Sequence, residues 1–170
     1  VIPTQGLENF ESSMIQAPAG AQLSEATRSF IASSEAFHIA YTTDAEGRRQ
    51  TTPPTTARDK VLLVGDSVVF GYGVNDEVTA ASQLQGQLGP ATQVVNAGVA
   101  GYDGDQVVRV AYRLSAAQDY STLVYVACQN DFSTDDDDAT IASVTRVMAG
   151  LKQLAGRFER GVVVVLTTYV

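Results

Sequence analysis

The sequence predicts an α/β domain with a mainly parallel, doubly wound sheet and helices on both of its faces. Short apolar segments alternate with segments of helical periodicity in steps of about 30 residues, which is the spacing of right-handed crossovers between parallel strands. The apolar segments are continuous rather than alternating with polar residues, so both faces of the sheet are expected to be covered. A chain of 170 residues, 45% hydrophobic and 18% charged, can form such a core.

The N-terminal third of the chain is less regular. We expect residues 1–57 to form an accessory segment and residues 58–170 to form the α/β domain. Within the accessory segment, the pattern favours a short helix over Ser24–Ala36, capped by Ser24, and a strand over 36–43. Residues 44–59 are polar and contain two prolines, which predicts a surface loop leading into the main domain.

The remainder of the chain alternates strands and helices. Apolar runs predict strands over 61–65, 92–98, 121–128 and 161–169, and periodic segments predict helices over 78–88, about 105–117 and about 139–158. Val107, Val110, Ala111 and Leu114 follow the i, i+3, i+4, i+7 pattern of one buried helix face. Gly89 and Pro90 provide the stop signal of the first of these helices.

Polar and glycine residues follow three of the strands at the edge where open α/β sheets bind their ligands. The first strand leads into Asp66 and Ser67, the second into Gly98, and the third into Asn130. A serine at a strand-to-helix turn can present its hydroxyl to a substrate. The backbone N–H groups of Ser67 and Gly98, with the amide of Asn130, could converge on one oxygen as an oxyanion hole.

These residues lie in three segments that resemble the sequence blocks of the SGNH hydrolases, also called GDSL-type esterases and lipases. The segments are GDSVVFGYGV (65–74), NAGVAGY (96–102) and CQND (128–131), in the family's order, and the resemblance extends over about residues 58–170. It implies a flavodoxin-like three-layer sandwich, with Ser67 as the nucleophile. It also implies that Gly98 and Asn130 donate to the oxyanion.

The sequence departs from that family in two respects. Cys128 stands where the third block usually has glycine, for which we expect a local adjustment. The fourth block, an Asp-x-x-His that supplies the general base, is absent, and a serine without a base is a poor nucleophile. The resemblance therefore implies the N-terminal portion of a longer or cleaved enzyme, or a fold completed by a second polypeptide carrying the Asp/His pair. The apolar run over 161–166 belongs inside a sheet and indicates the same.

Several of these residues also have an ordinary structural interpretation. Ser67 could simply cap a helix, and Asp66 is expected to anchor neighbouring loops through hydrogen bonds. His38, the only histidine, lies before the nucleophile in a strand-like segment, and we interpret it as structural rather than as the base. Cys128 has no basic neighbour in sequence that would lower its pKa, so it is interpreted as a small packing residue.

The remaining candidates are an acidic run and two tyrosines. Residues 135–138 are four aspartates, which we interpret as a solvated loop whose last members complement the N-terminus of the next helix rather than as a metal site. Tyr72 and Tyr102 flank the glycines of the first two blocks. Each could line a substrate pocket or serve in packing, and the sequence does not decide between the two roles.

The sequence therefore predicts a serine ester hydrolase that acts on a small-molecule or glycan ester and needs no cofactor or metal. The alternatives are an inactive binding module of the same fold and an acyltransferase to a glycan.

A net charge of −8 without a basic cluster argues against nucleic-acid binding, and no apolar run has the ~20 residues of a membrane span. One cysteine excludes an internal disulfide and leaves the compartment open. The start at Val1 suggests processing, which is compatible with export.

Overall fold

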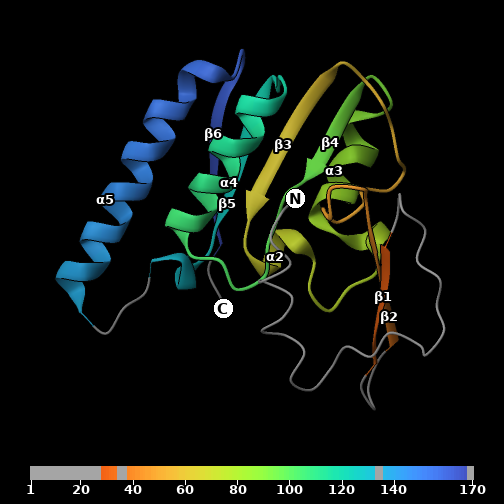
Figure 1. Ribbon diagram of the computed structural model, residues 1–170, viewed down its shortest axis with the longest axis horizontal. Coiled ribbons are helices and arrows are strands. Elements are labelled where there is room, and N and C mark those ends of the chain that lie inside the picture. The colour runs from red at the N-terminus through yellow and green to blue at the C-terminus, as the bar shows by residue number, and fades with distance from the viewer. Residues whose placement is uncertain (1–27, 34–37, 133–135, 168–170) are drawn as a thin grey trace.

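A four-stranded parallel sheet forms the centre of the molecule. The computed structural model describes residues 28–33, 38–132 and 136–167 (Figure 1). The strands are β3 (Asp59–Gly65), β4 (Thr92–Asn96), β5 (Thr122–Ala127) and β6 (Gly161–Leu166), in the spatial order β4-β3-β5-β6. All three pairings are parallel, so the carboxyl ends of the strands meet at one edge of the sheet.

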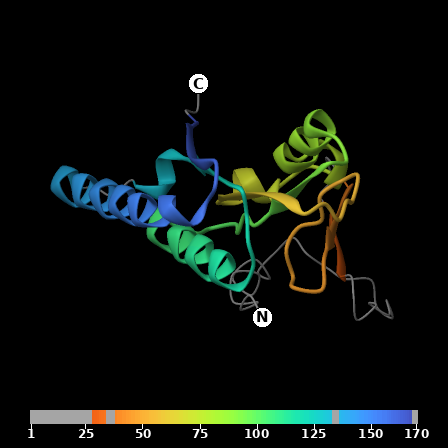
Figure 2. The ribbon, with the colours of Figure 1, turned by 90° about the horizontal axis from the view of Figure 1, so that it is seen from above.

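Helices cover both faces of this sheet, as predicted. They are α2 (Ser67–Phe70), α3 (Ala80–Leu88), α4 (Gly104–Ala117) and α5 (Asp137–Leu154), with 3-10 turns η1 (Asp76–Val78), η2 (Gln129–Asp131) and η3 (Ala155–Arg157). Figure 2 shows α4 and α5 on one side of the sheet and α3 on the other. The three-layer, doubly wound architecture is confirmed.

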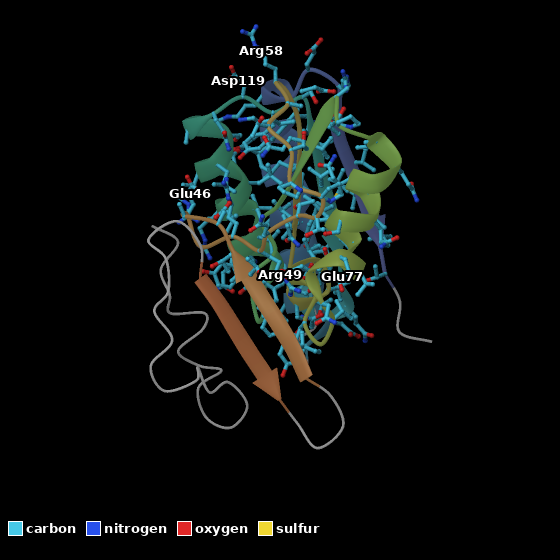
Figure 3. The ribbon with its side chains drawn as sticks, turned by 90° about the vertical axis from the view of Figure 1, so that its right-hand side faces the viewer. Glu46, Arg49, Arg58, Glu77 and Asp119 are labelled. Carbon is cyan, nitrogen blue, oxygen red and sulfur yellow. The ribbon has the colours of Figure 1, made fainter. Side chains whose placement is uncertain are left out.

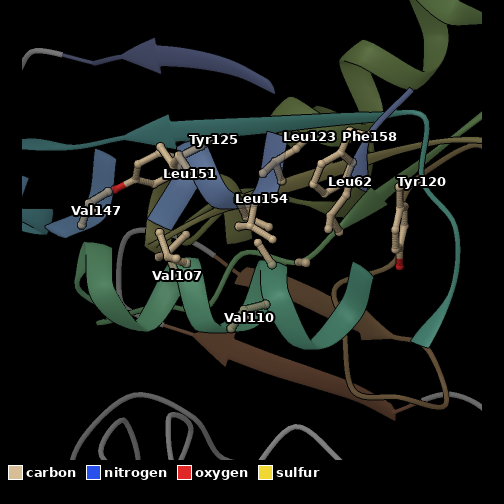
Figure 4. Packing of buried hydrophobic residues seen from close by; sticks show 14 of the residues in the cluster. Leu62, Val107, Val110, Tyr120, Leu123, Tyr125, Val147, Leu151, Leu154 and Phe158 are labelled. Atoms are coloured by element: carbon tan, nitrogen blue, oxygen red, sulfur yellow. The ribbon is translucent and has the colours of Figure 1, made fainter. Parts of the chain in front are cut away.

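Two hydrophobic clusters pack against the parallel sheet, one on each face. The larger, between the sheet and α4 and α5, includes Leu62, Leu123, Tyr125, Val107 and Leu151 (Figure 4). The smaller joins β3 and β4 to α2 and α3 through residues such as Leu63, Val69 and Ala81. Successive residues of β3 point to opposite clusters, which explains why the strand is apolar at every position.

The helix boundaries follow from capping side chains. Asp103 caps α4, forms a reciprocal capping box with Gln106, and begins the helix one residue earlier than predicted. Thr79 caps α3, so the predicted start at Val78 is in fact the end of the turn η1. Asp136 caps α5 by accepting two backbone N–H groups, which confirms that the last aspartates of the acidic run serve the helix N-terminus.

The predicted helix over Ser24–Ala36 is wrong where the structure describes it. Residues Arg28–Ser33 form strand β1, which pairs antiparallel with β2 (His38–Thr43) along its whole length. This ladder satisfies the backbone hydrogen bonds that a helix would otherwise form, and pairing of this kind overrides a weak local preference. The predicted strand over 36–43 is confirmed for His38–Thr43.

Strand β6 differs from the other three strands of the parallel sheet because it is an exposed edge. Val163, Val164, Val165 and Leu166 are 37–75% exposed, whereas the last five residues of β3 are all buried.

Among the described residues, no helix is both long and apolar enough to cross a membrane.

Candidate active site

Ser67 lies at the carboxyl end of β3, immediately after a tightly packed glycine. A side chain at Gly65 would come within 2.5 Å of Val69 Cγ2 and 2.8 Å of the Val126 carbonyl, so the strand can turn into α2 here only with glycine. Asp66 caps α2 by accepting the Val68 N–H, and Ser67 is the first residue of the helix rather than its cap. Ser67 is half-buried, and its hydroxyl and N–H have no hydrogen-bond partner among the described residues.

The Asp66 carboxylate ties the end of β3 to the end of β5. It is fully buried, and its Oδ2 accepts a hydrogen bond of 2.8 Å from the Asn130 amide nitrogen in turn η2. The sequence separation of these two residues is 64, so the contact depends on the parallel pairing of β3 with β5. Asn130 itself is exposed and retains a second amide N–H, beside the residue that precedes Ser67.

The loop after β4 closes against α2 through Asn96 and Gly98. Asn96 is buried, and its amide donates to the Val69 carbonyl, while its side-chain oxygen accepts the Gly98 N–H at 3.1 Å. A Cβ at Gly98 would lie 2.2 Å from the Phe70 nitrogen, so only glycine allows this approach. Gly98 therefore packs against α2, the helix that begins with Ser67, but its N–H donates to the Asn96 side chain.

Cys128 links the ends of β3 and β6 beneath the turn that carries Asn130. Its thiol donates to Asp66 Oδ1 at 3.4 Å and lies 3.1 Å from the hydroxyl of Thr167. Burial, with the Asp66 carboxylate as a smaller contribution, raises the pKa of the Cys128 thiol to about 11. Cys128 is 2% exposed and protonated at neutral pH, which agrees with a packing role in place of the usual glycine.

A second buried carboxyl, Asp131, supports the same turn. Its Oδ2 accepts the Tyr125 hydroxyl at 2.6 Å and the Cys128 N–H at 3.1 Å, and its Oδ1 has no partner among the described residues. Burial raises the pKa of Asp131 above its ordinary value, against the opposing effect of the Tyr125 hydrogen bond. Burial and the neighbouring Asp131 raise the pKa of Tyr125 as well, so its hydroxyl stays protonated as the donor.

The comparison with solved structures found esterases whose fold resembles that of this chain. A mutant form of the esterase AlinE4 matches 62% of this chain and 57% of its own, at 20% identity and a TM-score of 0.51. The fold is SGNH hydrolase-like. A family two carbohydrate esterase from Clostridium thermocellum, in complex with cellohexaose, matches 76% of this chain and 49% of its own, at 13% identity and a TM-score of 0.49. No family model and no curated protein matches the chain.

The chain spans about half the length of the solved structures it matches. The SGNH-like fold brings the ends of β3, β4 and β5 to one edge of the sheet, as the three sequence blocks imply. The division of the chain at residue 57 is a prediction that these matches do not test.

The other predicted residues occupy less decisive positions. His38 is the first residue of β2, in the hairpin rather than in the parallel sheet. Tyr102 packs against the larger core cluster, whereas Tyr72 is 40% exposed. Of the acidic run, Asp135 lies outside the described residues. Across the described parts of the chain, no group of three or more His, Cys, Asp or Glu side chains could hold a metal ion.

Sequence reasoning missed three side chains that organise this site. Asn96 and Asp131 occur inside the quoted blocks, and a polar residue at or shortly after the end of a buried strand is a signal that could have identified them. Arg49 lies far outside the blocks, in the polar segment before β3. No sequence pattern distinguishes it from its neighbour Arg48, although its side chain is fully buried beside α2.

Proposed function

We propose that this chain carries the nucleophile and the oxyanion-binding groups of a serine ester hydrolase that acts on carboxylic esters. The observation that supports this most directly is the Asn130–Asp66 hydrogen bond, which joins an amide donor to the residue next to Ser67. A second support is the half-buried Ser67 hydroxyl, which is unoccupied by other described residues and therefore available for a substrate.

In the proposed reaction, Ser67 Oγ attacks the ester carbonyl carbon, and its proton passes to a general base. The negative oxygen of the tetrahedral intermediate accepts hydrogen bonds from the Ser67 N–H and the second amide N–H of Asn130. Gly98 can contribute only by sharing the N–H that it directs to Asn96. The alcohol then leaves with a proton, and water attacks the acyl-enzyme to release the acid and restore Ser67.

The base is proposed to be a histidine outside these 170 residues, oriented by an aspartate. Within the chain, His38 is the only histidine, and it belongs to the β1–β2 hairpin. Asp66 and Asp131 are both fixed by hydrogen bonds to Asn130, Tyr125 and backbone groups. The proposed substrates are carboxylic esters of any acyl group and alcohol, and they include acetylated carbohydrates.

The test is the Ser67→Ala variant of the full-length protein, assayed with p-nitrophenyl acetate and butyrate. We expect kcat to fall by about 10³-fold or more, because the acyl-enzyme can no longer form. Ser115→Ala, at the far end of α4, is the control and should retain the activity. Undiminished turnover by Ser67→Ala would eliminate Ser67 as the nucleophile.

A non-catalytic binding module is the second candidate, favoured by the single histidine in the chain. A fluorophosphonate probe distinguishes it from the hydrolase. The enzyme should be phosphonylated on the peptide that contains Ser67, whereas a binding module should not react. Acyl transfer to a glycan shares the acyl-enzyme step and would be recognised by product analysis in the presence of a sugar acceptor.

A further inference from the structure

Arg49 is a buried cationic side chain near the proposed nucleophile. Its side chain has no exposed surface, although it comes from the polar segment that leads from the hairpin into β3. Arg49 pairs with Thr43 in an isolated β-bridge, which fixes its backbone beside β2. Figure 3 shows Arg49 at the junction between the hairpin and the body of the molecule.

The guanidinium group holds the turn that follows α2. It donates from Nη1 to the carbonyls of Phe70 and Gly71, at 3.3 and 3.1 Å, and from Nη2 to the carbonyl of Val74 at 2.8 Å. Its Nε donates to Asp76 Oδ1 at 2.5 Å, which balances the buried charge. All three guanidinium nitrogens are therefore used, in a planar fork that lysine cannot reproduce.

Aromatic groups complete this contact. The guanidinium carbon lies 4.5 Å from the centre of the Tyr41 ring and 5.3 Å from that of Phe70, within cation–π distance of both. The Tyr41 hydroxyl accepts the Gly73 N–H at 2.9 Å, so β2 holds the same turn at a second point. Asp76 also accepts the Thr42 N–H, which ties η1 to the hairpin.

This turn is directly connected to Ser67. Helix α2 has only four residues, and both Gly71 and Tyr72 donate their N–H groups to the Ser67 carbonyl. Gly71 has a φ of 80°, so the chain reverses there in the left-handed region. A helix of one turn has little stability of its own, so its position depends on external contacts. At its C-terminal end, Arg49 and Tyr41 contact Phe70, and the Asn96 amide donates to the Val69 carbonyl.

We propose that Arg49 is a positioning residue for the reaction of Ser67, and that residues 41–49 belong to the catalytic unit. The inference rests on the proposed function. Loss of the guanidinium lets the Phe70–Val74 turn move, and the Ser67 backbone moves with it. Reacting groups displaced by about 1 Å can lose about 100-fold in rate.

The test compares Arg49→Lys and Arg49→Met with Arg48→Met in the full-length protein. Arg48 is the matched control, since its ion pairs within the described residues are with Asp44 and Glu46 on the same segment. Titration with the fluorophosphonate probe counts functional sites. We expect kcat per titrated site to fall about 10- to 100-fold in the Arg49 variants and to be unchanged in Arg48→Met.

Amide hydrogen exchange separates positioning from a general loss of stability. In Arg49→Lys, the amides of Gly71, Tyr72 and Gly73 should exchange at least about 10-fold faster, whereas those of β3 and β5 keep their wild-type rates. If Arg49→Met does not fold, Arg49→Lys and Tyr41→Phe decide the matter. The Tyr41 variant loses only the acceptor of the Gly73 N–H.

The outcomes distinguish this inference from the proposed function. Full activity in Ser67→Ala would refute the proposed function and, with it, any role of Arg49 in that reaction. Loss of activity in Ser67→Ala, together with an unchanged kcat per site in Arg49→Lys, would refute the positioning role alone. Faster exchange in β3 and β5 as well as in the turn would also refute it, because Arg49 would then act on global stability.

Discussion

Strands β3 and β6 each contain a continuous run of valine and leucine, and the surroundings of the two runs are very different. β3 reads DKVLLVG and β6 reads GVVVVL, and both follow the continuous apolar pattern of an interior strand. Val64, Tyr125 and Val164 occupy one row across the sheet, so their side chains share a face. Val64 has no exposed surface and packs in the larger cluster, whereas Val164 is 37% exposed.

The comparison shows that an apolar strand sequence indicates that the strand requires a buried environment. It does not indicate that the described residues supply that environment. β3 is enclosed because β4 and β5 flank it and helices cover both of its faces. Among the residues that the structure describes, β6 is paired on one side only, and four of its consecutive apolar residues remain accessible. An exposed apolar edge of this kind favours association with other polypeptide.

The largest expected effect comes from the matched pair Val64→Ala and Val164→Ala. Removing two buried methyl groups at Val64 leaves a cavity, and we expect the free energy of unfolding to fall by about 2–3 kcal/mol. Val164→Ala should cost less than about 1 kcal/mol, since that side chain already contacts water. Urea unfolding of the 170-residue chain, followed by circular dichroism, measures both values.

The same pair in the full-length protein sharpens the comparison. If further polypeptide covers β6, the cost of Val164→Ala should rise toward that of Val64→Ala. If it stays small, the edge is open to solvent in the whole protein. Equal costs in the 170-residue chain itself would contradict the exposed position of Val164.

The next effect concerns Cys128, whose thiol lies between the end of β3 and the end of β6. Its pKa of about 11, against an ordinary value of 9.0, corresponds to an approximately 100-fold smaller thiolate fraction at pH 8. We expect Ellman's reagent to react at least about 100-fold more slowly with the native protein than with the urea-unfolded protein. The measurement is the absorbance of the released thiolate with time, and Cys128→Ser is the blank.

The sign of the pH effect follows from the same shift. The folded protein holds the thiol proton more tightly than the unfolded protein, so the contribution of Cys128 to stability is complete below about pH 9. It is lost as the pH rises through about 11. Native labelling as fast as that of the unfolded protein would mean that Thr167 and Asp66 do not enclose the thiol.

Most of the fold could be predicted because the elements after Lys60 are encoded locally. Their periodicity, capping residues and stop signals agree with one another, as in α4, where Asp103 and Gln106 mark the start. The hairpin could not be predicted in the same way. Residues 28–33 become a strand only because β2 pairs with them, and a partner in space leaves little trace in a short segment.

The same distinction between local and spatial information applies to the candidate site. Ser67, Gly98 and Asn130 could be proposed from the sequence because each follows a strand and belongs to a block that resembles those of a known family. Arg49 could not, since its identity as a buried cation depends on three carbonyl groups presented by a turn more than 20 residues away. Nothing in the local sequence separates it from its partly buried neighbour Arg48.

The last pair of substitutions concerns two glycines, one in the loop after β4 and one just before β6. In Gly98→Ala the added methyl group meets the α2 backbone at Phe70 and Val69, and forcing this overlap should cost about 1–3 kcal/mol of stability. In Gly156→Ala the methyl group meets nothing within 4 Å, so the change should stabilise the protein by about 0.4–1 kcal/mol through the unfolded state. Because Gly98 packs against the helix that begins with Ser67, Gly98→Ala should also lose esterase activity. Gly156→Ala should retain that activity. Thermal unfolding and the p-nitrophenyl acetate assay measure the pair, and a Gly98→Ala protein with wild-type values in both would show that the loop after β4 does not hold α2.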